Sequence, residues 1–119
     1  MLDFAIDLAR RAGALLRDGL SRQRQIDLKS PFELVTDMDR ASEQLIVGAI
    51  RTAYPSHAIL AEESGGAIDP AQPTWLIDPL DGTNNYAHGF PFFCVSLGLW
   101  AGPRPLLSLL QGVVGRLPP

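Results

Sequence analysis

Cysteine, lysine and long apolar runs are scarce in this sequence of 119 residues. Cys94 is the only cysteine, which excludes an internal disulfide, and its place in an apolar run predicts a buried thiol in a reducing compartment. Lys29 is the only lysine, and the basic residues do not cluster as nucleic-acid binding would require. No apolar run approaches the roughly 18 residues of a membrane helix, and Asp3 and Asp7 oppose a signal peptide. We therefore expect a cytoplasmic protein with no nucleic-acid or membrane partner.

Acidic residues, in contrast, are concentrated in the middle of the chain. Residues 33–81 contain nine Asp and Glu but only two basic residues, Arg40 and Arg51, although the net charge is only -3. This local excess opposes compact folding unless the carboxylates spread over the surface or surround cations. The length is sufficient for one hydrophobic core, so we expect a single domain over residues 1–119.

Hydrophobic periodicity predicts two amphipathic helices. Residues 2–20 carry apolar side chains at steps of three or four residues, and this helix is expected to end near Gly19. The second helix is expected to begin between Thr36 and Asp39, with Thr36 as its cap, and to stop at Tyr54 before a proline. Its expected buried residues are Leu45, Ile46, Ala49, Ile50 and Ala53.

The expected strands are short apolar runs between these helices and after them. The extended segments are residues 32–36, 58–61, 75–78 and 92–101, the last as a central strand. Helices and strands do not alternate as repeated βαβ units, so we predict an α+β layer arrangement. Residues 102–119 form an atypical tail, in which Pro103 and Pro105 are expected to interrupt any strand.

The sequence WLIDPLDGTNNY at residues 75–86 is typical of a hard-cation and phosphate site. An apolar strand leads to Asp78, Pro79 keeps the chain extended, and Gly82 lets a backbone amide approach an anion. Asp78 and Asp81 can share divalent cations, because Mg²⁺ takes oxygen ligands and leaves positions for a phosphate. These residues predict metal-assisted hydrolysis of a phosphate ester.

Two further acidic pairs follow apolar extended segments, namely Asp37 with Asp39 and Glu62 with Glu63. If the three segment ends converge, the carboxylates form one metal pocket. Each pair alone is also typical of a solvated turn or helix cap, so a plain α+β domain with solvated acidic turns is one alternative.

Other reactive side chains favour structural roles. His88 lies between two small residues, and His57 follows a Tyr-Pro turn. Cys94 has no neighbouring base in the sequence, and Ser64 has no triad partners.

The motifs together resemble the amino-terminal part of the inositol monophosphatase family of magnesium-dependent, lithium-sensitive phosphatases. LVTDMD at residues 34–39, ILAEES at residues 59–64 and the segment 75–86 have the family's order and spacing, and the similarity extends from about residue 2 to about residue 100. The resemblance implies a layered αβαβα sugar-phosphatase-like fold, truncated here to the first helices and strands.

The resemblance also implies a metal site. Glu62, Asp78 and the Leu80 backbone carbonyl would hold a first Mg²⁺, and Asp78 and Asp81 would contribute to a second.

Further residues resemble the family's catalytic and phosphate-binding positions. The amides of Gly82 and Thr83 would bind the phosphate of a small phosphorylated substrate. Glu63 and Thr83 would orient or deprotonate the attacking water, with Asp39 as the partner of Thr83. Lys29 resembles a position near that water, and a solvated charge is an equal alternative for it.

Family members are considerably longer, and their second half supplies a further metal-binding aspartate and substrate contacts. The prediction is therefore a magnesium-dependent phosphomonoesterase for inositol monophosphate or a similar ester, with activity reduced or absent in this short form. The alternative is a non-catalytic metal-binding or interaction fragment. Uncovered sheet edges would favour a homo-oligomer.

Overall fold

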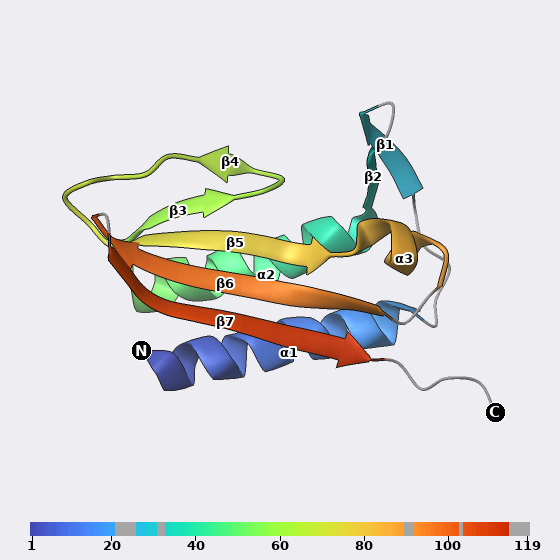
Figure 1. Ribbon diagram of the computed structural model, residues 1–119, viewed down its shortest axis with the longest axis horizontal. Coiled ribbons are helices and arrows are strands. Elements are labelled where there is room, and N and C mark those ends of the chain that lie inside the picture. Colours follow the sequence, from blue (N-terminus) through green and yellow to red (C-terminus); the bar gives the residue numbers. More distant parts are fainter. Residues whose placement is uncertain (21–25, 31–32, 90–91, 103, 115–119) are drawn as a thin grey trace.

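The protein consists of a mixed sheet with two long helices on one face (Figure 1). The computed structural model describes residues 1–20, 26–30, 33–89, 92–102 and 104–114. The helices are α1 (Leu2–Leu20), α2 (Asp37–Ala53) and the short α3 (Thr83–Ala87). The strands are β1 (Ile26–Ser30), β2 (Glu33–Thr36), β3 (Ala58–Ala61), β4 (Gly65–Gly66), β5 (Thr74–Asp81), β6 (Phe92–Ala101) and β7 (Arg104–Val114).

The main sheet has the strand order β4-β3-β5-β6-β7, and β1 and β2 form a separate antiparallel pair. Only β3 and β5 run parallel; the other neighbouring strands of the main sheet are antiparallel. This arrangement confirms the predicted α+β class. None of the helices in the described ranges is long and apolar enough to cross a membrane.

The first helix buries a stripe of mostly small side chains against the sheet. Ala5, Ala9 and Ala12 are fully buried, and Leu8 and Leu16 fill the spaces between them. Small residues let the helix approach β6 and β7 closely. The predicted helix over residues 2–20 is confirmed.

The second helix begins where its cap was expected. The backbone amide of Asp39 donates to Thr36 Oγ1, and the amide of Thr36 donates to Asp39 Oδ1 at 2.7 Å, forming a reciprocal capping box. Ile46 and Ile50 are buried as predicted. The expectation for Ala53 was wrong: it is exposed, because Tyr54 packs against the core at this end of the helix instead.

The sheet has one buried and one open face. On β6, Val95, Leu97 and Leu99 are buried against the helices, whereas Ser96 and Gly98 alternate with them on the opposite side. Because β6 has a neighbour on each side, the prediction of an interior strand over residues 92–101 is confirmed.

Three strand predictions need correction. The polar residues 26–30 form β1, which pairs with β2 although its sequence has no clear period. The strand predicted at residues 75–78 continues to Asp81. The tail also forms a strand, β7, over residues 104–114.

Proline is tolerated in β7 because of its position. Pro105 pairs with Trp100 at a register shift, and β7 lies at the edge of the described sheet. An edge strand needs only some of its amides for the ladder, so a missing N–H costs little there. Pro103 and residues 115–119 lie outside the described residues.

Candidate functional site

A bulge in β5 brings two aspartates to the same face of the sheet. Asp78 pairs with Ser96 and Asp81 pairs with Cys94, so three steps along β5 correspond to two along β6. In a regular strand, residues three apart point to opposite faces, but this extra residue places both aspartates on the open face. The spacing Asp-Pro-Leu-Asp therefore places both carboxylates on one face only because of the register shift between β5 and β6.

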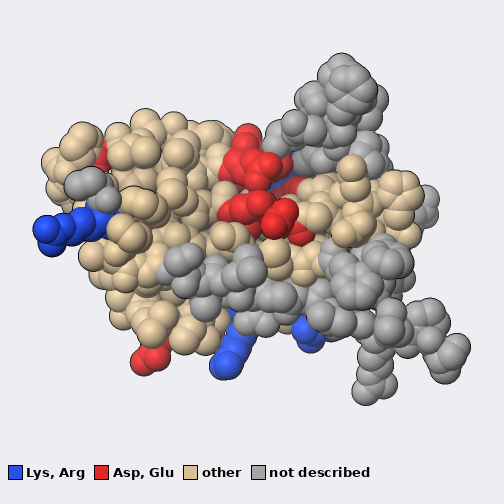
Figure 2. Space-filling model, viewed as in Figure 1, with Lys and Arg blue, Asp and Glu red and all other residues tan. Residues whose placement is uncertain are grey.

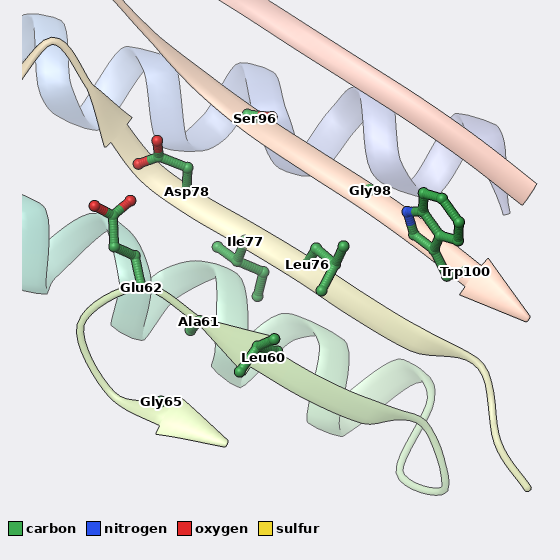
Figure 3. A pocket seen from close by; sticks show the side chains of 10 residues that line it. All are labelled: Leu60, Ala61, Glu62, Gly65, Leu76, Ile77, Asp78, Ser96, Gly98 and Trp100. Carbon is green, nitrogen blue, oxygen red and sulfur yellow. The ribbon is translucent and has the colours of Figure 1, made fainter. Parts of the chain in front are cut away.

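Glu62 reaches the same place from the neighbouring strand. Because β3 and β5 are parallel, both strands end at the same edge, and the amide of Glu62 donates to the Ile77 carbonyl at 3.1 Å. Figure 3 shows the Glu62 and Asp78 side chains pointing toward each other. The two predicted metal ligands thus meet although they are 16 positions apart in the chain.

The electrostatics of this pair are unfavourable without a cation. Burial, and then the hydrogen bond and charge of Glu62, raise the pKa of Asp78 from 3.8 to about 7. The nearby charge of Asp81 raises it further, against the lowering effect of the Leu80 amide, which donates to Asp78 Oδ1 at 3.3 Å. A cation bound between these carboxylates would relieve the repulsion that contributes to this raised pKa.

The open face is hollowed beside these carboxylates. A cavity of about 610 Å³ is lined by Glu62 and Asp78 at one end and by Leu60, Leu76 and Trp100 along the strands (Figure 3). Figure 2 shows acidic side chains gathered on this face near the ends of β3 and β5. Within the described ranges, no group of three or more His, Cys, Asp or Glu side chains is arranged to hold a metal ion.

The turn after β5 places a hydroxyl beside the acidic segment. Gly82 has φ of 92°, a left-handed conformation that favours glycine, and it precedes the first turn of α3. Thr83 Oγ1 lies 2.8 Å from Asp39 Oδ2 and 3.1 Å from the Leu80 carbonyl, and its single proton can serve either acceptor. Asp39 also accepts the Thr36 hydroxyl at 2.6 Å, so it joins the start of α2 to the start of α3.

Two polar residues of α2 that the motifs did not point to also contact the site. Ser42 Oγ donates to the Pro79 carbonyl at 2.8 Å, and Glu43 Oε1 accepts from the Glu63 amide at 2.9 Å. Both are buried. The available signal was their position on the helix, since Asp39 and Glu43 share the stripe that continues with Ile46.

The other residues considered in the sequence analysis lie at the following positions. Lys29 lies in β1, and its side chain is outside what the structure describes. Glu63 is half-buried directly after Glu62. Asp37 is exposed in the first turn of α2. His88 caps the end of α3, where its Nδ1 lies 2.6 Å from the Asn84 carbonyl.

The expectation of a buried Cys94 was wrong. Strand alternation places this residue on the open face, where it is partly exposed and its thiol donates to Asp81 Oδ2 at 3.6 Å. Burial first, and then the charge of Asp81, raise the pKa of the thiol to about 11. The sulfur is therefore protonated at neutral pH, which argues against a nucleophile.

Two curated proteins illustrate the similarity of this chain to known sequences. Inositol monophosphatase 2 from Solanum lycopersicum is 40% identical over 118 residues, covering 95% of this chain and 44% of that protein. Inositol monophosphatase 1 from Sus scrofa is 44% identical over 102 residues, covering 82% of this chain and 37% of that protein.

Two solved structures illustrate the similarity in fold. The extragenic suppressor protein suhB from Bartonella henselae matches with a TM-score of 0.86 at 32% identity, covering 92% of this chain and 43% of that one. The Thermotoga maritima IMPase gives a TM-score of 0.84 at 36% identity, covering 92% and 42%.

The fold and the sequence are thus those of a family of phosphatases. The family model of the inositol monophosphatase family matches residues 1–116, and the chain belongs to that family. The match extends beyond residue 100, where the resemblance was expected to end, and includes β7, which continues the sheet. The chain spans less than half the length of the relatives described above.

Proposed function

We propose that this chain carries the metal- and phosphate-binding half of a magnesium-dependent phosphomonoesterase for inositol monophosphate or a similar small phosphate ester. The observation that supports this most directly is the meeting of Glu62 and Asp78 from two parallel strands, with Asp81 on the same face. A solvated turn would separate these carboxylates to reduce repulsion. Their convergence therefore favours a cation.

The donor set fits Mg²⁺. All of the proposed ligand atoms are oxygens, namely the carboxylates of Glu62, Asp78 and Asp81 and the Leu80 carbonyl, and Mg²⁺ prefers such ligands. When bound, the cation would supply Lewis-acid stabilisation of charge on the phosphate oxygens. In the metal-free protein the raised pKa of Asp78 marks a place where negative charge is disfavoured, and a bound cation would offset that cost.

The neighbouring residues would position the other reactants. The backbone amides of Gly82 and Thr83, at the turn into α3, would donate to the phosphate. With its proton directed at Asp39 Oδ2, Thr83 Oγ1 has lone pairs free to accept a hydrogen bond from the attacking water. Glu63 is proposed as a second residue that orients this water, and Lys29 as a nearby positive charge.

Phosphate release from inositol monophosphate tests this proposal. We expect any phosphate release by the purified chain, which the short form should reduce, to require Mg²⁺, and Asp78→Asn to lower the rate at least a hundredfold by removing a ligand. Asp7→Asn is the matched control, because Asp7 is exposed on α1 and its ion pair with Arg11 at 3.9 Å contributes little. Equal rates for the chain and Asp78→Asn would contradict the assignment.

A non-catalytic metal-binding or interaction fragment is the second candidate. It is favoured because the relatives are more than twice as long as this chain, which spans 44% of the inositol monophosphatase 2 from Solanum lycopersicum. This candidate predicts Mg²⁺ binding that depends on Asp78 without phosphate release. A cytoplasmic location and a homo-oligomer remain predictions, which cell fractionation and sedimentation of the purified chain would test.

A further inference from the structure

One face of α2 contacts three other segments of the site. Asp39, Ser42 and Glu43 are spaced at i, i+3 and i+4, so they lie on the same side of the helix. Their exposed fractions are 1%, 0% and 6%. Each contacts a different segment: Asp39 bonds to Thr83 of α3, Ser42 to Pro79 of β5, and Glu43 to Glu63 after β3.

Burying these polar residues costs free energy that apolar residues would not cost if packing were the only role of α2. Farther along α2, the same stripe is completed by Ile46 and Ile50, which are fully buried apolar residues. Burying a polar side chain such as that of Glu43 costs free energy unless it finds a hydrogen-bond partner, and here the partner is the Glu63 amide. The presence of Glu43 at this buried position therefore indicates a role in hydrogen bonding that an apolar side chain could not fill.

The two bonds act on residues directly next to the proposed ligands. Glu43 holds the amide of Glu63, which follows Glu62, and Ser42 holds the carbonyl of Pro79, which follows Asp78 within the bulge. Both anchors come from consecutive residues of one rigid helix. They therefore set the separation of the two strand ends from which the facing carboxylates project.

We propose that Ser42 and Glu43 are positioning residues that hold Glu62 and Asp78 facing each other for cation binding. The inference rests on the proposed function, since it assumes that these two carboxylates bind a divalent cation. Asp39, on the same face of α2, adds a third contact, because it accepts a hydrogen bond from the Thr83 hydroxyl. The helix thus presets the geometry of the site before any cation arrives.

Mn²⁺ binding, followed by electron paramagnetic resonance, tests this role in the full chain. Glu43→Ala removes the acceptor and is expected to weaken Mn²⁺ binding about tenfold, as loss of a residue that orients a ligand typically does. Glu43→Gln keeps an oxygen acceptor for the Glu63 amide and is expected to stay within about threefold of the unmodified chain. Ser42→Ala should weaken binding as well, whereas Gln44→Ala, an exposed neighbour on α2, should not.

Crystal structures of Glu43→Ala and Ser42→Ala separate this inference from the proposed function. We expect the Glu62 and Asp78 carboxylates to move apart in either variant, whether or not the chain binds Mn²⁺. If the unmodified chain fails to bind Mn²⁺, the proposed function is overturned, and the carboxylate geometry still decides the positioning role. An unchanged pair of carboxylates in both variants, or equal weakening by Glu43→Gln and Glu43→Ala, would overturn the inference.

Discussion

At the scale of single side chains, Asp78 carries an electrostatic cost in the metal-free protein. Its pKa is raised to about 7, chiefly by burial and then by Glu62, although the carboxyl remains partly exposed. A raised carboxyl pKa means that ionisation is harder in the folded than in the unfolded chain. The penalty is absent below about pH 4, grows as the pH rises, and is complete above about pH 7.

We therefore predict that Asp78→Asn stabilises the metal-free chain at high pH. The gain at pH 8 should be about 1–2 kcal/mol, well below the full value for such a shift because solvent screens a partly exposed group. Urea unfolding with a chelator at pH 4, 6 and 8 measures it, and the advantage should disappear at pH 4. A difference that is constant with pH would point to packing instead of charge.

Between elements, the contact of α1 with α3 depends on one glycine. Tyr86 is fully buried, and its hydroxyl donates to the Leu16 carbonyl at 2.8 Å. A Cβ at Gly19 would lie 2.7 Å from that hydroxyl and 2.5 Å from Met38 Cε. The methionine end can move, but the tyrosine can do so only by breaking its hydrogen bond, which ties α3 and the turn at Gly82 to α1.

Gly19→Ala is accordingly predicted to destabilise the chain by about 1–3 kcal/mol, through overpacking and loss of the Tyr86 bond. Thermal unfolding measures the loss. In a Tyr86→Phe background, where the hydroxyl is absent, the same substitution should cost clearly less. Gly48→Ala is the matched control, because that glycine in α2 has nothing within 4 Å of a new Cβ and should be neutral or stabilising. Equal costs at positions 19 and 48 would contradict the close contact.

Elements were predictable from the sequence where local signals specify them. Both long helices have a clear apolar period, and the start of α2 is set by the Thr36 cap. The strands β1 and β7 were missed because pairing partners, not local propensity, stabilise them. Pro105 argues against a strand locally, and its edge position becomes evident only in the assembled sheet.

The candidate site, like the fold, was predictable only where a local sequence motif specifies its residues. The motif predicted which carboxylates form the candidate site, but the bulge that brings Asp78 and Asp81 to one face is a property of pairing with β6. The bonds of Ser42 and Glu43 join residues 37 and 20 positions apart in the chain. No local pattern specifies such long-range partners.

Across the whole molecule, an aromatic cluster joins both long helices to the sheet. Phe4 of α1 contacts Tyr54 at the end of α2 and Trp75 of β5, with ring centroids 5.1 and 6.0 Å apart. His57 stacks on Tyr54 at 4.8 Å and accepts the Trp75 indole N–H at Nδ1, at 3.0 Å. Since an indole nitrogen can only donate, Nδ1 of His57 must be the unprotonated nitrogen. The predicted turn residue is therefore also the hydrogen-bond partner of a fully buried tryptophan.

We predict that His57→Phe destabilises the chain by about 1–3 kcal/mol, because stacking on Tyr54 is kept while the buried Trp75 N–H loses its acceptor. A double-mutant cycle with Trp75→Phe isolates the bond: without the indole donor, the His57 substitution should cost little. Urea unfolding of the four variants at pH 8, followed by circular dichroism, supplies the free energies. An equal cost of His57→Phe with and without the indole would assign the effect to packing of the ring alone. A coupling of 1 kcal/mol or more would show that this hydrogen bond, beside the ring contacts, joins the start of β5 to the turn after α2.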